Sequence, residues 1–561
     1  MRNRPRRSLL GFVVVVAAFL VVVPILIAVL GGEPSSDDGK LSDRDERGRP
    51  LLTLAYSPEK AQLFERLVGE FNKQNPRYAV RAIKVEMTDM LSQAVEGRFA
   101  AISPDSAIWL GTLDQAWLAA EPDRANLVGS LSRFALSPVV IATWQSEAQK
   151  MGYPGKAVGW ADLASRATQE PSFRWSHPSS TTAAGLLATT AEFYAGSGKT
   201  ARLTQADLNV PAVQDYVRKV ERTIQQYGGE SEDQVLARLL NQSQRTLDAF
   251  VAQEALVVRF NRQARGEKLV ALYPREGTLW MDHPLALLEG PWLTPEHRRA
   301  FKEFSDFLRT PPLQRIVLQE GYRPADLGIS LDDPDSQIKP ANGVDPAQPQ
   351  TLLPMPSYGV LDSLRNAWML LKRPANIMLV ADTSGSMEGD KIDRAREALQ
   401  TFVGQVRGSS DRLGLVTFAS SVHEDVPLGD LSQNRAQLTA TIGDLRASGN
   451  TALYDGTLFA AERLSALKQT DRMNVVVVMT DGRENASRRV RSSSDPQPLI
   501  AALQDLNRRT GVPVLVFAVA YGGDADLAGL QKLSESTHAQ AYRGDPDTIR
   551  RLYQLLSAFF S

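Results

Sequence analysis

The sequence of 561 residues contains no cysteine. This absence excludes disulfide bonds, thiolate metal sites, cysteine nucleophiles and lipid attachment through a cysteine. Histidine is also scarce, with five residues, and their positions show no spacing typical of a metal site. The net charge of −1 provides no excess of positive charge, so no nucleic-acid partner is predicted. The length itself predicts two or more domains.

Long apolar runs are absent after residue 30, but one lies at the N-terminus. Basic residues precede an uncharged run over 9–30, and these 22 residues span about 33 Å as a helix, enough to cross a bilayer. A cleaved signal peptide is the alternative, but its apolar core is usually shorter and ends in a small-residue cleavage site. The sequence therefore favours an uncleaved transmembrane helix. The basic flank then stays in the cytoplasm, and the domains after the helix lie outside it.

A polar motif follows the apolar run 376–381, which is typical of a buried strand. It reads Asp382-Thr383-Ser384-Gly385-Ser386, and a helical pattern follows over 390–406. The motif therefore occupies a strand-to-helix loop at the carboxyl edge of a sheet, where open α/β folds bind ligands. One carboxylate and two hydroxyls offer oxygen ligands, which suit a hard divalent cation.

Two further segments complete this motif. The apolar run 474–479 ends in Thr480-Asp481-Gly482, and a Gly-rich turn between the two runs carries Thr451. The pattern over roughly 373–561 resembles the metal-ion-dependent adhesion site of von Willebrand factor A (VWA) domains. The resemblance implies a Rossmann-like doubly wound domain that binds Mg²⁺, with Mn²⁺ or Ca²⁺ as other candidates. It also implies that a partner protein's carboxylate takes the open coordination position. The implied metal ligands are Asp382, Ser384, Ser386, Thr451 and Asp481.

Other interpretations of these residues are weaker. Helix capping by Asp382 and the serines leaves Thr451 and Asp481 without a role. A phosphatase of the haloacid dehalogenase type needs a second acid where Ser384 stands, and an aspartic protease needs a second copy of its motif. A P-loop ending in Lys199 would need glycine where Phe193 stands. We therefore predict no catalytic residues and no enzyme; metal-assisted hydrolysis of phosphoesters is kept as a hypothesis to test.

Strand and helix patterns alternate over 51–330, which indicates an α/β fold. The segments 51–56, 137–142 and 269–277, in this order, resemble a two-lobed, type II extracytoplasmic solute-binding protein. A ligand would then lie between the lobes. A hydroxyl-rich turn before a helix offers donors to an oxyanion or small molecule. The alternative is that Ser180 or Thr181 is an ordinary N-cap and the rest of the turn is exposed. The candidate ligand-binding residues are Ser179, Ser180, Thr181 and Thr182.

Proline and aspartate interrupt the pattern over 331–358, and a short amphipathic helix follows over 360–371. Trp368 on this helix packs either between the two modules or within the second. The predicted order is a cytoplasmic stub (1–8), a transmembrane helix (9–30), a tether (31–50), a solute-binding-like module (51–330), a linker with its helix (331–372) and a VWA domain (373–561). The working hypothesis is a single-pass membrane protein of a bacterial surface, acting as sensor or adhesion protein. A tethered receptor for an ABC-type transporter is the alternative.

Overall fold

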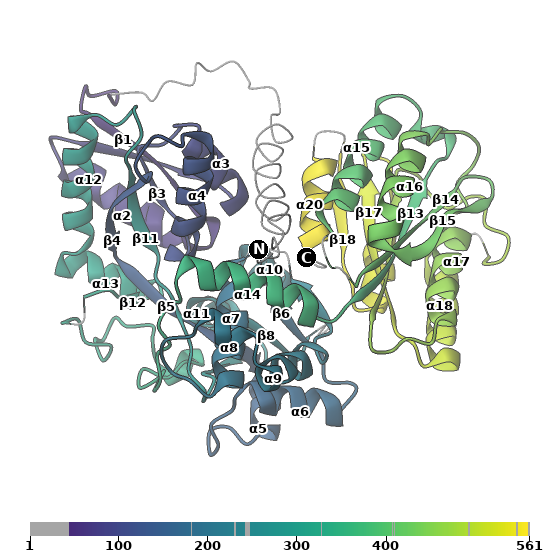
Figure 1. The fold of residues 1–561 in the computed structure, drawn as a ribbon, viewed down its shortest axis with the longest axis horizontal. Coiled ribbons are helices and arrows are strands. Elements are labelled where there is room, and N and C mark those ends of the chain that lie inside the picture. Colours follow the sequence, from purple (N-terminus) through teal and green to yellow (C-terminus); the bar gives the residue numbers. More distant parts are fainter. Residues whose placement is uncertain are drawn as a thin grey trace, which may run out of the picture.

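The computed structural model of the protein describes residues 44–561 except 181, 229–231, 242–246, 327, 407, 409, 492–493, 546–547 and 559–561. Three sheets organise the chain, two in the part coloured purple to teal and one in the part coloured green to yellow (Figure 1). In the described part, no helix is long and apolar enough to cross a bilayer. The predicted transmembrane helix at 9–30 lies outside the described residues.

The first lobe is a five-stranded sheet covered by helices on both faces. Phe64, Phe71 and Phe304 meet between α2 and α12, with ring centroids 5.0–6.2 Å apart. The strand order is β2 (Ala79–Lys84), β1 (Leu51–Tyr56), β3 (Ala101–Ser103), β11 (Pro284–Leu288), β4 (Val128–Arg133). The helices are η1 (Pro58–Lys60), α2 (Ala61–Gln74), α3 (Met87–Val95), η2 (Ala107–Trp109), α4 (Leu110–Ala120), α12 (Pro295–Leu308) and α13 (Pro311–Gln319).

The second lobe is built around the long strand β5 (Ala135–Trp144). Its sheet has the order β10 (Trp280–Met281), β5, β8 (Ala249–Gln253), β6 (Trp175–Pro178), β7 (Gln226–Gly228), and β9 (Leu269–Leu272) and β12 (Arg323–Pro324) also pair with β5. The helices are α5 (Gln145–Lys150), α6 (Trp160–Gln169), α7 (Ala183–Ser197), α8 (Gln205–Leu208), α9 (Pro211–Glu221), α10 (Glu232–Asn241) and α11 (Glu254–Gln263). The chain passes between the lobes at Phe134, at 282–283 and after α13, so short segments join them.

The third sheet has six strands, all parallel except the edge strand β15. The order is β15 (Val422–Asp430), β14 (Arg412–Phe418), β13 (Ala375–Asp382), β16 (Met473–Thr480), β17 (Val514–Tyr521), β18 (Ala541–Gly544). Strands β13, β16 and β17 are buried along their whole length, because helices cover both faces. A hydrophobic core lies on each face of this sheet. The first core includes residues of η4 (Gly385–Met387), α15 (Asp390–Gln405), α16 (Leu431–Gly443) and α20 (Ile549–Ala558). The second core includes residues of α17 (Leu453–Ala466), α18 (Gln497–Thr510) and α19 (Leu527–Ser536). The predicted mixed α/β fold is confirmed.

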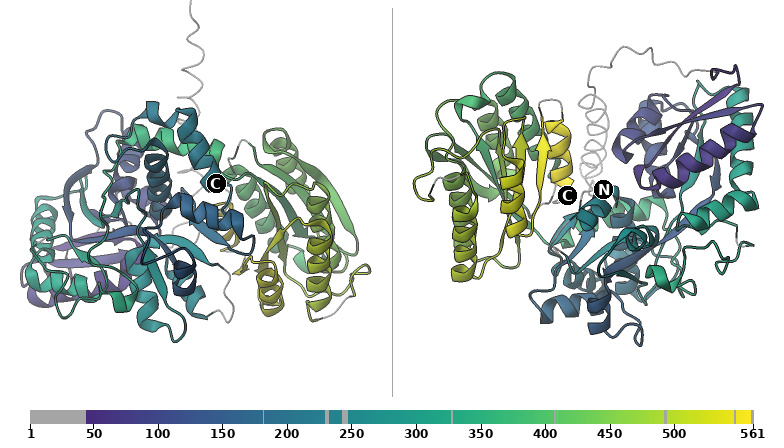
Figure 2. Two further views of the ribbon diagram at one scale, coloured as in Figure 1. Left: turned by 90° about the horizontal axis from the view of Figure 1, so that it is seen from below. Right: turned by 180° about the vertical axis from the view of Figure 1, so that it is seen from behind.

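A connecting segment with η3 (Pro340–Asn342) leads to α14 (Tyr358–Leu371), which lies against the two-lobed part (Figures 1 and 2). The guanidinium of Arg365 lies 5.6 Å from the ring of Trp109 in the first lobe. The indole of Trp368 donates a 2.6 Å hydrogen bond to Glu221 in the second lobe. Helix α14 therefore contacts both lobes, and Trp368 packs against Glu221 and His177 of the second lobe.

Candidate metal centre

The centre lies at the carboxyl edge of the third sheet. Strands β13 and β16 are parallel neighbours, with Ala381 paired to Met479. Asp382 at the end of β13 and Asp481 directly after β16 therefore emerge at the same level. The Thr480 hydroxyl donates a 2.5 Å hydrogen bond to Asp382 Oδ2, and the Ser384 backbone N–H donates to Asp382 Oδ1 at 2.8 Å. These bonds fix the orientation of the Asp382 carboxylate.

Backbone hydrogen bonds join the three loops of this edge. The Gly385 N–H donates to the Gly449 carbonyl at 2.9 Å, and the Ser448 N–H donates to the Thr383 carbonyl at 2.7 Å. The turn before α17 is thereby held against the loop after β13. Thr451 is tied to the loop after β16, because its carbonyl accepts from the Asn485 N–H at 3.0 Å.

Hydrogen bonds connect the predicted ligands themselves. Ser384 Oγ and Ser386 Oγ lie 3.1 Å apart, and Ser386 Oγ donates to Asp481 Oδ1 at 2.7 Å. A Cβ placed on Gly482 would lie 3.2 Å from Thr451 Oγ1 and 3.6 Å from Ser386 Oγ. Gly482 therefore leaves a space bordered by both hydroxyls. The structure brings the five predicted residues together around an all-oxygen donor set, which fits a hard divalent cation.

Burial differs sharply among the five residues. Asp382, Ser384, Thr451 and Asp481 are at most 3% exposed, whereas Ser386 is exposed. Burial raises the pKa of Asp382 to about 6, since the hydrogen bonds from Ser384 and Thr480 only partly offset the loss of water. The centre is thus lined by buried oxygens and opens to solvent at Ser386.

Lys391 is a neighbour that the sequence analysis missed. It stands in the first turn of α15, and its ammonium donates to Asp481 Oδ2 at 2.6 Å. Its side chain is 30% exposed. In the sequence, Lys391 is marked only by its position shortly after the predicted metal-binding loop. A lysine at that position is not part of any metal-binding pattern.

Replacing Lys391 with methionine should strengthen metal binding. The ammonium bound to Asp481 would compete with a cation for this carboxylate, and a partly exposed ion pair contributes about 0.2–1 kcal/mol, or up to about a fivefold change in affinity. Titration calorimetry with Mn²⁺ should show this gain for Lys391→Met. Lys391→Arg keeps the charge and should bind Mn²⁺ like the wild type; equal affinities for all three proteins would contradict the competition.

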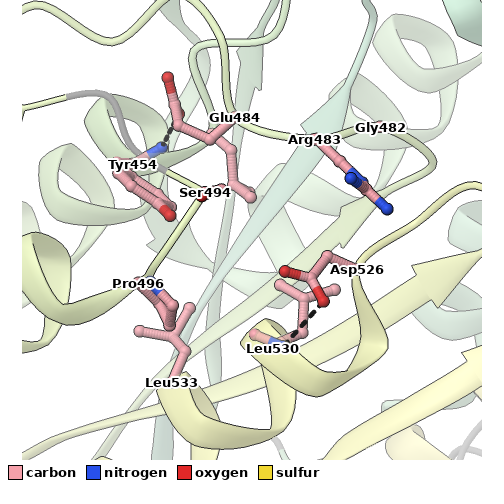
Figure 3. A pocket seen from close by; sticks show the side chains of 11 residues that line it. Tyr454, Gly482, Arg483, Glu484, Ser494, Pro496, Asp526, Leu530 and Leu533 are labelled. Carbon is pink, nitrogen blue, oxygen red and sulfur yellow. Dashed lines mark hydrogen bonds between the residues drawn. The ribbon is translucent and has the colours of Figure 1, made fainter.

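A pocket adjoins the centre, beginning at the residue after Asp481 (Figure 3). Arg483, which is exposed, and Asp526 lie on one side of it, and Tyr454 and Pro496 lie on the other. The Tyr454 backbone N–H donates to Glu484 at 2.9 Å, which holds this side of the pocket. The lining residues are Leu453, Tyr454, Gly482, Arg483, Glu484, Ser494, Pro496, Asp526, Gly529, Leu530 and Leu533.

The hydroxyl-rich turn of the second lobe joins β6 to α7. Thr182 is the N-cap of α7: its hydroxyl accepts from the Gly185 N–H at 3.1 Å and donates to the Ser179 carbonyl at 3.0 Å. Ser179 and Ser180 are buried, and Thr181 lies outside the described residues. A Cβ on Gly185 would lie 2.0 Å from the Ser179 carbonyl oxygen, so the turn packs directly on the helix. The turn therefore caps the helix, but through Thr182 and not through Ser180 or Thr181, and its serines are buried instead of exposed. Ligand binding by this turn stays a prediction.

A buried charge cluster, also missed from the sequence, lies where the lobes meet. Lys60 at the end of η1 is 1% exposed and pairs with Glu59 at 3.8 Å, while Arg259 of the second lobe donates to the Glu59 carbonyl at 2.9 Å. The Trp109 indole donates to Asp105 at 2.8 Å. Burial, followed by the charge of Glu59, raises the pKa of Asp105 to about 7.

The raised pKa of Asp105 predicts a pH-dependent stability. Between about pH 4 and pH 7 the folded carboxyl keeps a proton that the unfolded one, with an ordinary pKa of 3.8, has lost. The stabilisation linked to this proton is complete below pH 4 and is lost as the pH rises through 7. Tryptophan-monitored urea unfolding should show a falling midpoint over this range, and a smaller fall in Asp105→Asn. The same fall in both proteins would show that Asp105 is not the group responsible.

Two family models match the chain, one after the other. The model of bacterial extracellular solute-binding proteins matches residues 52–323, and that of the von Willebrand factor type A domain matches residues 376–553. The chain therefore has a solute-binding domain followed by a VWA domain, and the five candidate ligands lie within the second match. Both domains are of binding or adhesion types, and this order is consistent with an extracytoplasmic binding protein.

The chain also resembles curated proteins and solved structures in part. It is 30% identical to pig inter-alpha-trypsin inhibitor heavy chain H4 over 114 residues, which are 19% of this chain and 12% of that protein. It is 28% identical to mouse calcium-activated chloride channel regulator 3A-1 over 138 residues, 24% and 14% of the two chains. The sulfate-binding protein SubI of Mycobacterium tuberculosis is 17% identical, with 50% of this chain and 89% of that chain covered and a TM-score of 0.37. The chain thus spans less than a fifth of the length of these two curated relatives.

Proposed function

We propose that the protein is a membrane-anchored extracytoplasmic binding protein whose VWA domain holds a divalent cation and, through it, a carboxylate of a partner protein. The observation that carries this proposal is the cluster of five oxygen-bearing residues, four of which are joined by hydrogen bonds while the Thr451 hydroxyl borders the same space, buried except at Ser386. Asp382, Ser384, Ser386, Thr451 and Asp481 would hold the cation, with Mg²⁺ the best fit and Mn²⁺ or Ca²⁺ as other occupants. VWA domains commonly bind such a cation.

The donor set favours binding without catalysis. Mg²⁺ takes six oxygens in octahedral geometry, so five protein side chains leave a position for an incoming ligand. The ion supplies positive charge there, and only two of its protein ligands are charged, which keeps it attractive to an anion. Ser386 is exposed at the mouth, so an incoming carboxylate would meet the centre there.

The surroundings suggest how a partner would be oriented. Arg483 is exposed beside the centre and would attract further acidic groups. The adjoining pocket, with Leu453, Leu530 and Leu533 in its lining, would accept an apolar side chain next to the partner's acidic residue. A short acidic and apolar motif is therefore the expected target.

The solute-binding domain would recognise a small molecule, an oxyanion or a fragment of the cell envelope, with Ser179, Ser180, Thr181 and Thr182 as the candidate contacts. Its family match favours a second candidate function, a tethered receptor that delivers a solute to an ABC-type transporter. Solute uptake that is unchanged after deletion of the gene would exclude that function.

The proposed function is tested by affinity capture from an envelope extract. The full chain should capture a partner in Mg²⁺ and lose it in chelator, and Asp382→Ala should capture none. Lys391→Arg serves as a matched control that alters a neighbour of the centre while all five ligands stay in place. Bands that persist in chelator, or that Asp382→Ala retains, would show that the metal does not mediate the contact.

A further inference from the structure

A second group of ligating side chains lies inside the solute-binding domain. It consists of His177 near the end of β6, Glu192 on α7 and Glu221 at the last position of α9. Each is 0% exposed, and one nitrogen or oxygen from each lies within 4.8 Å of the other two. Three elements of the second lobe therefore direct one imidazole and two carboxylates to a common point.

Glu192 is the most informative member. Neither of its oxygens takes part in a hydrogen bond, although the side chain is completely buried. Within the described residues, His177 Nε2 lies 3.6 Å from Glu192 Oε1, and no lysine or arginine lies within 4.0 Å of this carboxylate. A carboxylate in such a place requires either a proton or a cation.

The hydrogen bonds around the group favour a cation. The Pro178 carbonyl can only accept, so the 2.5 Å contact from His177 Nδ1 places the imidazole proton on Nδ1 and a lone pair on Nε2. The Thr189 hydroxyl lies 3.4 Å from Nε2 but donates its proton to the Gly185 carbonyl at 3.0 Å. The Trp368 indole donates to Glu221 Oε1 at 2.6 Å. Metal-binding histidines and carboxylates are typically held by outer hydrogen bonds of these two kinds.

We propose that His177 Nε2, Glu192 and Glu221 bind one divalent transition-metal ion, with Zn²⁺ the best fit. One nitrogen and two carboxylates form a mixed donor set typical of Zn²⁺, whereas Mg²⁺ and Ca²⁺ favour oxygen ligands in larger number. The two carboxylates cancel the charge of the ion, so the group is neutral when buried. The 3.6 Å between His177 Nε2 and Glu192 Oε1 is close to the ~3.4 Å between ligands about 2.1 Å from a tetrahedral zinc.

The ion would stabilise the junction between the two domains. Glu221 accepts its hydrogen bond from Trp368, which belongs to α14, and α14 leads into the first strand of the VWA domain. Metal bound to Glu221 would fix the carboxylate that anchors this helix. Removing the ion should therefore loosen α14 on the second lobe and leave the adhesion centre intact.

Titration with Co²⁺ tests this site on the full chain in detergent micelles, after treatment with chelator and in excess Mg²⁺ to fill the VWA centre. One equivalent of Co²⁺ should give visible ligand-field absorption and quench tryptophan fluorescence, because Trp368 contacts Glu221. One equivalent of Zn²⁺ should reverse both signals. Asp382→Ala should behave like the wild type, which separates this site from the proposed adhesion centre.

Glu192→Gln is the decisive variant, since it keeps the shape of the side chain and removes its charge. It should bind Co²⁺ at least about 100-fold more weakly, with circular dichroism confirming that it is folded. Unchanged Co²⁺ binding by Glu192→Gln would overturn the proposal. The proposal would also be overturned if the wild-type protein showed neither Co²⁺ absorption nor quenching, and this result does not depend on whether the variants fold. The two carboxylates would then share a proton in place of the ion.

Discussion

Lys372→Met should lower the free energy of unfolding of the VWA domain by about 3–5 kcal/mol, the usual cost of removing one partner of a buried ion pair. Lys372 and Asp411 are each 1% exposed in their side chains and lie 3.2 Å apart. Asp411 also accepts a 2.7 Å hydrogen bond from the Ala375 N–H at the start of β13. The substitution would leave the Asp411 carboxylate buried beside the central strand without the ammonium that pairs with it.

The distribution of tryptophan provides an internal control for this measurement. All eight tryptophans lie between residues 109 and 368, so none belongs to the VWA domain. Urea unfolding followed by circular dichroism should therefore show a destabilised transition, while the transition followed by tryptophan fluorescence should stay near its wild-type midpoint. Lys372→Met/Asp411→Asn should recover part of the loss. A wild-type midpoint in both signals would show that the pair contributes little.

Gly482→Val should weaken Mn²⁺ binding about 100-fold without removing any ligand, because overfilling a packed site costs about 1–3 kcal/mol. Valine methyl groups would enter the space bordered by Thr451 and Ser386, since even a Cβ would lie 3.2 Å from Thr451 Oγ1. Gly482→Ala is the matched control and should lose less affinity, because it adds one carbon in place of three.

Calorimetry with Mn²⁺ on the wild type and both variants measures this series. The order of affinity should be wild type, then alanine, then valine, with unchanged circular dichroism. If valine at position 482 binds Mn²⁺ as glycine does, the cation does not lie between Thr451 and Ser386, and the assignment of the centre would have to change.

The proximity of Asp382 and Asp481 could be predicted from the sequence, because it follows from sheet topology. Asp382 and Asp481 each end an apolar run, and parallel neighbouring strands bring such ends together. Lys391 could not be predicted, because a lysine in the first turn of a helix usually faces solvent. Its contact with Asp481 depends on how α15 packs against the sheet.

The buried group of His177, Glu192 and Glu221 in the solute-binding domain could not be predicted from the sequence at all. His177, Glu192 and Glu221 stand 15 and 29 residues apart, on a strand and two helices. No local spacing marks them, because it is tertiary packing that joins them. Capping of α7 by a hydroxyl of the turn before it was expected, and Thr182 is the residue that caps it. The sequence could not identify the capping residue, because a pattern locates the start of a helix only to within a residue or two.

The position of β13 determines how the protein would carry mechanical load. This strand begins just after α14 and ends at Asp382, so a pull between a metal-bound partner and the connecting helix runs along its axis. It is paired over seven positions with β14 on one side and over seven with β16 on the other. Such a load shears both ladders at once, so many hydrogen bonds must break together instead of opening in turn. The central strand would thus give the proposed partner contact a stiff, force-bearing path.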